Sequence, residues 1–413
     1  MRFKRLLPLA IGAALFSGAA DAAPDAYWDF MSQAITGHPA YRVFVASKDS
    51  AASLLTIEEA RRYPKVEGVL SRMDGASTLT TTPSAWQTGL SLTYPLFDNY
   101  RQDARDQIAR TQGQQELTTS AQQMERLMVD LANAHIRMWE ASESIKVLQG
   151  AGRHMAVLQA RLAEQVKAGE ASVLLQSKFT KMGLDIKTKL LDAQQRFESA
   201  SKTWAITGTT PGQGTLLPTV AVTPEVRTSH ATLRKLEAEF ARAESEHTLA
   251  KRDEGLAVNL QASTLARKYS TQPGLPQYQI WQVNATYPLF DGGLAASRTQ
   301  REALNMATKR AELEAEQSQT AIELARLQAW LAAMQNIIAS FEEQCQLQNQ
   351  ITENMMTRFD LGRGNLTEVT EGYLAAKDCS LTVIRNRADY FTRYHDLSKL
   401  NGTLATLIMG DKQ

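Results

Sequence analysis

The chain has few of the residues that interrupt helices or cross-link small folds. Its 413 residues include 12 prolines and 2 cysteines, and long stretches contain neither Pro nor Gly. Two cysteines are too few for a disulfide-built scaffold or for a zinc site made of four cysteines. The scarcity of helix breakers favours long, uninterrupted helices.

An excess of charge of one sign is also lacking. The chain carries 45 Lys+Arg and 44 Asp+Glu, a formal net charge of +1. A dedicated nucleic-acid binder would gather a basic excess on one face, so we expect no nucleic-acid partner. The six histidines are scattered without an HExxH pair, and no nucleophile–base pair is visible. We therefore expect no metal and no cofactor.

The first residues have the pattern of an export signal. A positive segment (2–5) precedes an apolar run (6–18), and a small-x-small cleavage site lies before Ala23. The run is shorter than the roughly 20 apolar residues of a membrane-spanning helix, and nothing after Ala23 approaches one. An ordinary N-terminal core helix is the alternative. We expect residues 1–22 to be removed, and the mature protein to be periplasmic, secreted or placed in an outer membrane as a β-barrel.

The sequence contains an internal duplication. Tyr-Pro-Leu-Phe-Asp at 94–98 recurs at 287–291, an offset of 193 residues (287 minus 94). The same offset carries Gly169 onto Gly362 and one hydrophobic register, with steps of three and four, onto another. We expect two structural repeats. Their boundaries, after the signal peptide, are 23–207 for the first repeat, 208–223 for a linker and 224–413 for the second repeat.

Each repeat has the same order of helices. Steps of three and four between apolar residues are typical of a coiled-coil seam. A Gly-containing break between two such helices predicts an antiparallel hairpin, because Gly readily adopts the positive φ that ends a helix. The expected helices, first and second repeat in turn, are 39–62 and 224–252, then 99–167 and 292–360, then 171–206 and 366–405.

Short alternating segments precede each hairpin. The expected strands are 65–73, 86–96, 256–266 and 279–289. Runs of roughly nine to eleven residues with one apolar face match transmembrane β-strands; the alternative is a pair of soluble β-hairpins with one buried face. Pro95 and Pro288 each end a strand by removing a backbone donor. Asp98 and Asp291 then lie where a helix N-cap belongs.

The number of strands predicts an oligomer. Four strands cannot close a membrane barrel, whose smallest form has about eight. An open sheet edge is not tolerated in lipid. Other chains must therefore complete the barrel, and twelve strands in a trimer (four from each of three chains) is the simplest closure. The helical hairpins would then pack side by side into a tube.

These features resemble the TolC-type outer-membrane efflux channels. The resemblance rests on the order of elements, the duplicated Tyr-Pro-Leu-Phe-Asp, and Arg358-Phe359-x-x-Gly362 before a long helix. Asp291-Gly292-Gly293 is the fuller family form of the strand-to-helix turn, from which Asp98-Asn99-Tyr100 departs. The resemblance covers essentially the whole mature chain. It implies a mainly α fold with a small β part: a homotrimer with a twelve-stranded barrel in outer-membrane lipid and a helical barrel in the periplasm.

The resemblance also implies a function. Such proteins are channels and not enzymes. They dock a periplasmic adaptor and an inner-membrane transporter of the ABC or RND type, and they export drugs or type I secreted proteins. The hairpin tips that touch the adaptor would be Gly169 in the first repeat and Gly362, Arg363 and Gly364 in the second. The alternatives are a periplasmic adaptor, which normally has one hairpin, or a coiled-coil scaffold, which would not explain the strands.

Two acidic residues are candidates for a constriction. In the TolC-type channels a pair of acidic residues just after the second tip lines the narrowest point. Counting without gaps from Gly362 places them at Glu368 and Glu371, although the resemblance leads us to expect Asp. Their i, i+3 spacing puts both carboxylates on one helix face. A trimer would stack them in two rings, a cation-selective arrangement. The alternative is a solvated helix face.

The two cysteines allow a disulfide hypothesis. Cys345 lies 17 residues before Gly362 (362 minus 345) and Cys379 lies 17 after it (379 minus 362), at the same height in a hairpin. Bridging requires Cα atoms within about 7 Å, closer than helices usually pack. Two buried thiols acting as small hydrophobic residues are the alternative. His135 and His154 are expected on the surface of their helix.

Overall fold

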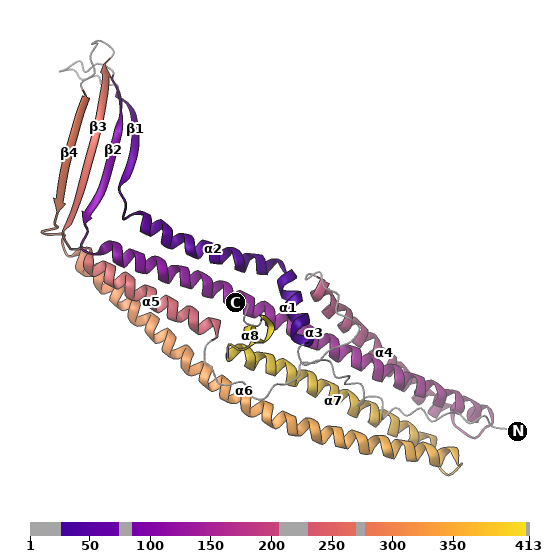
Figure 1. Cartoon of the computed structure of the whole chain (residues 1–413). Helices are drawn as coiled ribbons and strands as arrows, with labels where there is room; N and C mark the ends of the chain where they lie inside the picture. Colours follow the sequence, from indigo (N-terminus) through magenta and orange to yellow (C-terminus); the bar gives the residue numbers. More distant parts are fainter. Residues whose placement is uncertain (1–25, 74–84, 206–229, 270–276, 410–413) are drawn as a thin grey trace. The chain divides into compact units, whose positions relative to one another are not determined.

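Long helices dominate the fold. The structure, a computed structural model, describes residues 26–73, 85–205, 230–269 and 277–409. The expected signal peptide (1–22) and linker (208–223) lie outside these ranges. The helices are α1 (Ala26–Gly37), α2 (Pro39–Ala60), α3 (Arg101–Lys167), α4 (Val173–Ala205), α5 (Ala231–Arg252), α6 (Leu294–Asp360), α7 (Leu366–Leu400) and α8 (Leu404–Met409) (Figure 1).

The two longest helices correspond to each other in the two repeats. Both α3 and α6 have 67 residues, about 100 Å at ~1.5 Å per residue. The expectation of a mainly α chain with a small β part and long antiparallel hairpins is confirmed. None of the described helices combines the length and the apolar character needed to cross a membrane.

Some helix bounds differ from expectation. The short helix α1 was not expected, because its 12 residues give too short a stretch for a clear helical repeat and precede the pattern that begins at Pro39. The last helix was expected to run to residue 405 but stops at Leu400, since Gly402 adopts a positive φ of 70°. There the amide of Thr403 donates to the carbonyl of Ser398 (2.9 Å), a helix-ending arrangement. The chain then begins the separate helix α8.

The chain divides into two compact units, which we describe separately. Unit 1 comprises the described residues within 1–42, 123–230 and 319–413, and unit 2 those within 43–122 and 231–318. Unit 1 holds α1, α4, α7, α8 and the C-terminal parts of α3 and α6. Unit 2 holds the sheet, α5, most of α2 and the N-terminal parts of α3 and α6.

Unit 2 contains a four-stranded antiparallel sheet. Its strands are β1 (Lys65–Met73), β2 (Ala85–Phe97), β3 (Ala257–Tyr269) and β4 (Gln277–Thr286). They lie in the order β1-β2-β3-β4 (Figure 1). The β2–β3 pairing therefore joins the first repeat to the second. Among the described residues, β1 and β4 have a neighbour on one side only. β4 was expected to reach residue 289 but ends at Thr286.

The apolar face of the sheet is open. Val66 pairs with Leu92 and Leu260 pairs with Val283, so these side chains share one face. Trp281 and Val283 on that face are 73% and 62% exposed. A soluble hairpin with one buried face would cover such residues. Exposed apolar side chains along the sheet instead fit a surface that faces lipid.

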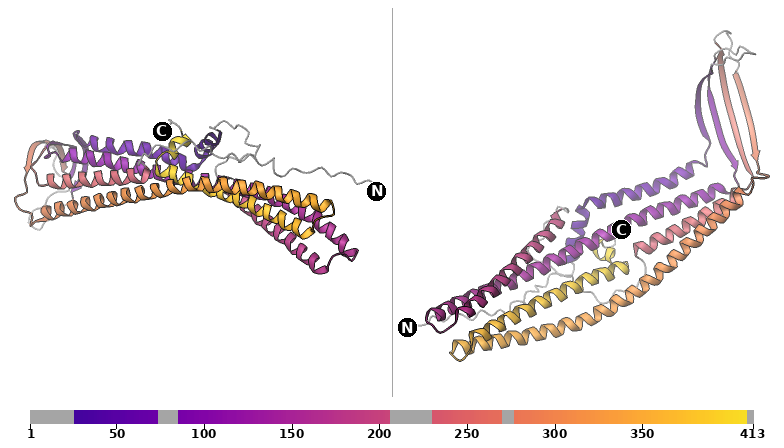
Figure 2. Two further views of the ribbon diagram at one scale, coloured as in Figure 1. Left: turned by 90° about the horizontal axis from the view of Figure 1, so that it is seen from below. Right: turned by 180° about the vertical axis from the view of Figure 1, so that it is seen from behind.

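Two helical hairpins that pack against each other make up most of unit 1. The α3–α4 and α6–α7 hairpins turn back at the same end of the unit (Figure 2). Apolar residues from both hairpins form one core near these turns, including Leu158, Phe179 and Val369. A second core follows the predicted seam of α6, where Leu324, Leu327 and Leu331 are buried against Tyr390 and Tyr394 of α7.

A buried cluster of rings holds α1 within unit 1. The Tyr27 hydroxyl lies 3.1 Å from Nε2 of His395, and the two rings are stacked. His135 packs edge-on against Tyr27 and Trp204. The expectation that His135 lies on the surface is wrong, because α1 and α4 cover that face of α3 and leave the side chain buried. Burial lowers the pKa of His395 to about 3 and raises that of Tyr27.

We predict that acid detaches α1. In the unfolded state His395 has a pKa of about 6.5, whereas burial lowers its folded-state pKa to about 3. The unfolded state therefore binds the extra proton, and stability is lost as pH falls from about 6.5 towards 3, by roughly 1.4 kcal/mol per pH unit. Hydrogen exchange of the α1 amides should accelerate steeply between pH 7 and pH 5, after correction for intrinsic exchange.

The matched variant is His395→Gln, which keeps a polar side chain but cannot be protonated in this range. Its α1 exchange should depend much less on pH than that of the unsubstituted protein. An equally steep pH dependence in His395→Gln would show that another group causes the effect.

Candidate functional site

Each strand-to-helix turn is held by its aspartate. Oδ2 of Asp98 accepts a hydrogen bond from the amide of Gln102 (2.6 Å). Asp291 accepts from the amides of Ala295 (2.7 Å) and Gly293 (2.9 Å). These backbone donors hold the pKa of Asp291 below its usual range, because they stabilise the charged carboxylate, and the amide of Ala295 has the largest effect. In both turns, the aspartate thus accepts hydrogen bonds from backbone amides at the start of the long helix.

The two turns share a backbone conformation despite different sequences. Gly292 and Gly293 have φ values of 70° and 85°, and the corresponding Asn99 and Tyr100 have 56° and 59°. A non-glycine residue in this left-handed region costs on the order of 1–2 kcal/mol. The departure from Gly-Gly in the first repeat therefore keeps the turn but adds strain.

Contacts with α5 offset this strain in the first turn. Nδ2 of Asn99 donates to the carbonyl of Arg252 (2.9 Å), and Nη1 of Arg252 donates to the carbonyl of Tyr100 (2.7 Å). The guanidinium also lies 5.9 Å from the centre of the Tyr100 ring. A Cβ added at Gly255 would come within 1.8 Å of Nδ2 of Asn99. The first turn is thus fitted to the end of the second repeat's α5.

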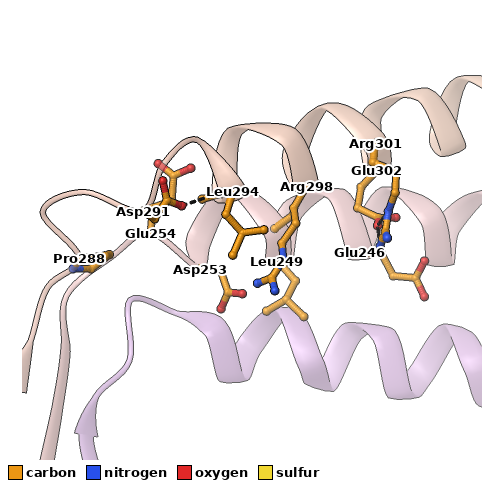
Figure 3. A pocket seen from close by; sticks show the side chains of 12 residues that line it. Glu246, Leu249, Asp253, Glu254, Pro288, Asp291, Leu294, Arg298, Arg301 and Glu302 are labelled. Carbon is orange, nitrogen blue, oxygen red and sulfur yellow. Dashed lines mark hydrogen bonds and ion pairs between the residues drawn. The ribbon is translucent and has the colours of Figure 1, made fainter.

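A pocket lies beside the second turn. It has a volume of about 460 Å³ and lies between the end of α5 and the start of α6. Figure 3 shows Glu246, Asp253 and Asp291 near Arg298 and Arg301. Five carboxylates and two guanidinium groups line it, so both signs of charge are present with an acidic excess. Within the described ranges, no group of His, Cys, Asp and Glu is arranged to hold a metal ion.

The hairpin tips are built alike. Gly169 and Gly362 have φ values of 79° and 72°. After the first, the amide of Glu170 donates to the carbonyl of Gln165 (2.9 Å); after the second, Arg363 donates to Arg358 (2.9 Å). This 6→1 bond with a left-handed glycine is the Schellman helix ending. Both tip glycines and Arg363 are exposed.

The helix after each tip begins at a polar cap. The side chain of Asn365 accepts from the amide of Thr367 (2.9 Å), and the hydroxyl of Ser172 accepts from the amide of Leu175 (3.2 Å). Ser172 and Asn365 differ by 193 in number, so the caps are equivalent. Gly364 is close-packed, because an added Cβ would lie 2.8 Å from the amide nitrogen of Phe359.

Glu368 and Glu371 lie on one exposed face of α7. Val369 and Thr370 between them are buried against the hairpin core, which turns both glutamates outward. The same exposed stripe continues to Ala375 and Asp378, seven residues further on each. The structure therefore places the two carboxylates together just after the second tip, on a face of unit 1 that is open in the single chain.

The two hairpins also contact each other near the tips. Nη1 of Arg161, on α3, lies 2.9 Å from Oδ1 of Asp360, the last residue of α6. The same guanidinium lies 5.6 Å from the centre of the Phe359 ring. His154 stacks on Tyr373 at 4.6 Å between ring centres, and burial, then the Arg153 charge, lowers its pKa. His154 is thus half-buried between hairpins, which the sequence pattern along α3 alone did not indicate.

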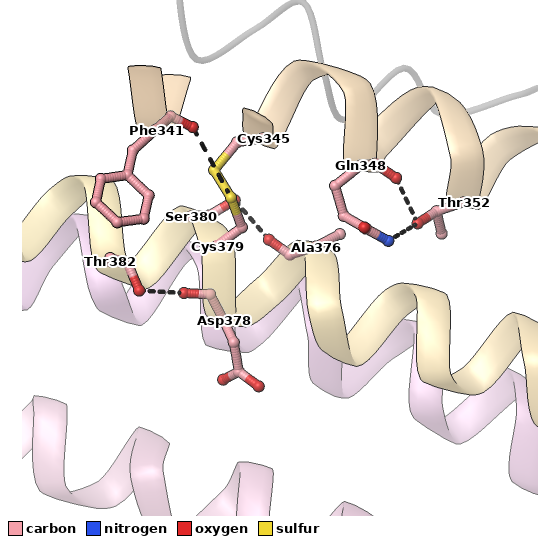
Figure 4. Close-up of a disulfide and its surroundings, with 9 residues drawn as sticks. All are labelled: Phe341, Cys345, Gln348, Thr352, Ala376, Asp378, Cys379, Ser380 and Thr382. Carbon is pink, nitrogen blue, oxygen red and sulfur yellow. Dashed lines mark hydrogen bonds between the residues drawn. A yellow bond between two sulfur atoms is a disulfide. The ribbon is translucent and has the colours of Figure 1, made fainter. Parts of the chain in front are cut away.

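Cys345 and Cys379 form a disulfide between α6 and α7 (Figure 4). Their Cα atoms are 5.6 Å apart, within the roughly 4.4–6.8 Å that a disulfide allows. Small residues on α7 permit this approach: Gly372, Ala376 and Ser380 recur every fourth position. A Cβ added at Gly372 would already lie 3.1 Å from Sδ of Met355. The bridge therefore lies on a stretch of α7 that carries small residues.

Comparisons with known proteins show the fold. No protein-family model and no curated protein matches the chain. Solved structures do. The outer membrane protein VceC of Vibrio cholerae matches with a TM-score of 0.78 and 14% identity, over 92% of this chain and 96% of that one. The open-state MtrE outer membrane channel of Neisseria gonorrhoeae gives 0.78 and 15%, over 94% and 90%.

The CmeC outer membrane channel of Campylobacter jejuni gives a TM-score of 0.77 with 13% identity, over 90% of this chain and 84% of that one. The chain therefore has the fold of the TolC-type outer-membrane channels, as its sequence resemblance predicted. Each of these three matches covers at least 90% of this chain.

We predict that the second tip depends on glycine at 362. Gly362→Ala forces an L side chain into the left-handed region, which costs roughly 1–2 kcal/mol. The tip should open more easily, and the Arg363 amide, which bonds to Arg358, should exchange with solvent on the order of ten times faster. Hydrogen exchange with mass spectrometry measures this.

Gly150→Ala is the matched control. Gly150 lies inside α3, and nothing lies within 4 Å of an added Cβ. This variant should leave the tip unchanged and stabilise α3 by roughly 0.5–1 kcal/mol. Unaltered Arg363 exchange in Gly362→Ala would mean that the tip bond does not depend on the left-handed conformation.

Proposed function

We propose that the chain is one subunit of a homotrimeric export channel. It spans the outer membrane with its strands and extends into the periplasm as a helical tunnel. Its substrates are small-molecule drugs or type I secreted proteins. The proposal rests on two observations together. The chain has a channel fold over 92% of its length, and within the described residues its sheet has an open apolar face and two open edges.

The sheet has the two faces that a membrane barrel requires. Its strands have 9, 13, 13 and 10 residues, enough to cross a bilayer when tilted. The face opposite Trp281 carries Gln261, Gln282 and Asn284, and Nδ2 of Asn284 donates to Oε1 of Gln261 (3.2 Å). Polar side chains on that face suit a water-filled interior.

Three copies supply the strands that one chain lacks. Four strands per chain give twelve in a trimer, and closure removes every free edge. The same symmetry would bring the hairpins of unit 1 together around a central passage. Glu368 and Glu371 of the three chains would then form two rings of carboxylates, which favour cations.

The hairpin tips suit a protein partner. Large apolar side chains are exposed beside both turns: Leu361 at the second, Val173 and Leu174 at the first. Exposed apolar residues gathered in one place commonly mark an interaction site. We assign this surface, together with Gly169, Gly362, Arg363 and Gly364, to a periplasmic adaptor that links the channel to an inner-membrane transporter of the ABC or RND type.

Planar-bilayer recording tests the channel and its constriction. The protein should fractionate with the outer membrane and form conducting pores that prefer cations. Glu368→Gln with Glu371→Gln removes the charge of both rings at nearly constant volume. We expect this double variant to lose most of its cation preference and to conduct at a level similar to the parent.

Asp378→Asn is the control, because it removes one exposed carboxylate further along the same stripe of α7. It should change cation preference much less than the double variant. Equal effects of the control and the double variant would mean that other residues determine the cation preference. Protein that stays in the soluble periplasmic fraction and never conducts would overturn the channel proposal itself.

A further inference from the structure

The two copies of Tyr-Pro-Leu-Phe-Asp are covered to different extents. Leu96 and Phe97 of the first copy are 50% and 42% exposed, whereas Leu289 and Phe290 of the second are each 91% exposed. β2 continues to Phe97, but β4 ends at Thr286. Because the five residues are identical, sequence does not explain the difference. Among the residues that the structure describes, the first copy has a neighbouring strand on that side and the second has none.

The neighbour of the first copy is the second repeat of the same chain. Tyr94 pairs with Leu260, Pro95 with Asn259, and, after a bulge, Phe97 with Val258. Arg252 and Asp253 at the end of α5 contact the adjoining turn, with Nη1 of Arg101 3.6 Å from Oδ1 of Asp253. In this internal junction, β2 of the first repeat pairs with β3 of the second repeat. It is the template for a junction in which the second repeat of one chain pairs with the first repeat of another copy.

Two sequence offsets relate the strands of the internal junction to the strands at the free edges of the sheet. Tyr94 corresponds to Tyr287, so β2 maps onto β4 by 193. Lys65 pairs with Thr93, and Ala257 pairs with Thr286. Since Thr286 is the equivalent of Thr93 (93 plus 193), Ala257 is the equivalent of Lys65, and β1 maps onto β3 by 192 (257 minus 65). The hairpins therefore differ by one residue in register.

We propose that β4 pairs antiparallel with β1 of a second copy of this chain in a defined register. The internal pair Leu92–Ala262 maps to Ala285 opposite Leu70 of the partner subunit (92 plus 193; 262 minus 192). The internal pair Tyr94–Leu260 maps to Tyr287 opposite Gly68 of the partner subunit. This interface rests on the trimeric channel proposed above and specifies how its subunits join.

The register keeps the apolar faces of the two strands on the same side of the sheet. Ala285 shares a face with Trp281 and Val283, and Leu70 shares a face with Val66. A slip of one residue would place Val69 opposite Ala285 and turn the partner strand over. The offset of 193 alone would give that slipped register, so the one-residue difference between the hairpins is what makes the two edges compatible.

The register also explains why residue 68 is a glycine and why the second Tyr-Pro-Leu-Phe-Asp copy is exposed in the single chain. Nothing lies within 4 Å of a Cβ added at Gly68, so the Tyr287 ring can lie across it, as aromatics do over strand glycines. On pairing, β4 extends from Thr286 through Phe290, as β2 does to Phe97. Pro288 interrupts the new ladder no more than Pro95 interrupts the old one.

Cysteine cross-linking tests the register. Ala285→Cys with Leu70→Cys places two sulfurs on directly opposite residues, about 4.5–5.5 Å apart at Cα, within disulfide range. Mild oxidation in isolated outer membranes should give covalent dimer and trimer on non-reducing gels. Ala285→Cys with Val69→Cys, one residue out of register, should give little. Leu92→Cys with Ala262→Cys, the internal pair, is the positive control and should close within one chain.

Preferential cross-linking of the shifted pair would overturn the register, and so would an internal pair that closes while 285–70 does not. Bilayer conductance of the same preparations separates the two proposals. Conducting protein without the 285–70 bond contradicts the register and leaves the channel intact. Protein that neither conducts nor cross-links between chains contradicts both.

Hydrogen exchange of the unsubstituted protein decides the matter if the variants fold poorly. Within the assembled protein, the amides of Tyr287, Leu289 and Phe290 should be protected to a similar degree as those of Tyr94, Leu96 and Phe97. Fast exchange at 287–290 beside slow exchange at 94–97 would show that β4 is not extended by a partner, and the proposed pairing would be wrong.

Discussion

The backbone hydrogen bonds at the two edges of the sheet are the constraint on which the rest depends. β1 and β4 each present a row of amides and carbonyls without a partner in the described chain, on a sheet whose apolar face is open. In hydrocarbon each unpaired group costs several kcal/mol. One chain cannot satisfy these groups, because it supplies four strands. In the proposed trimer, closure by further copies would satisfy them.

The internal duplication gives this closure its geometry. A chain of two similar repeats already contains one junction between a first and a second repeat, at β2–β3. Closing a ring requires only that the free ends form the same junction again. The two repeats are not identical at this point: Asn99 and Tyr100 adopt a strained turn that α5 stabilises, whereas Gly292 and Gly293 adopt it without strain and with open space around them. The second turn is thus tolerant of a partner, while the first is fitted to its own chain.

Much of the fold was predictable from local patterns. The lack of Pro over 101–167, and of both Pro and Gly over 294–360, indicated the long helices. Strict alternation indicated the strands to within about three residues. The Gly-centred tips followed from the need for positive φ. Contacts between elements distant in sequence were not predictable in this way. His135 is buried because α1 and Trp204 cover it, and Arg161 meets Asp360 only once two hairpins pack.

In the candidate site, too, local spacing predicts some features, while others depend on contacts between distant elements. Spacing around Gly362 placed Cys345 and Cys379 at one height, but their close approach also depends on Gly372 and Ala376, whose importance is visible only in the packed hairpin. Glu368 and Glu371 share an exposed face, as their spacing predicts, and their role depends on neighbouring subunits that the single chain does not contain.

The number of chains in the detergent-extracted protein tests the central claim most directly. Native mass spectrometry of protein taken from the outer membrane counts the copies without any substitution. The proposed twelve-stranded barrel, with four strands from each chain, predicts a single species of three chains. A stable monomer, with both sheet edges unpaired, would contradict it.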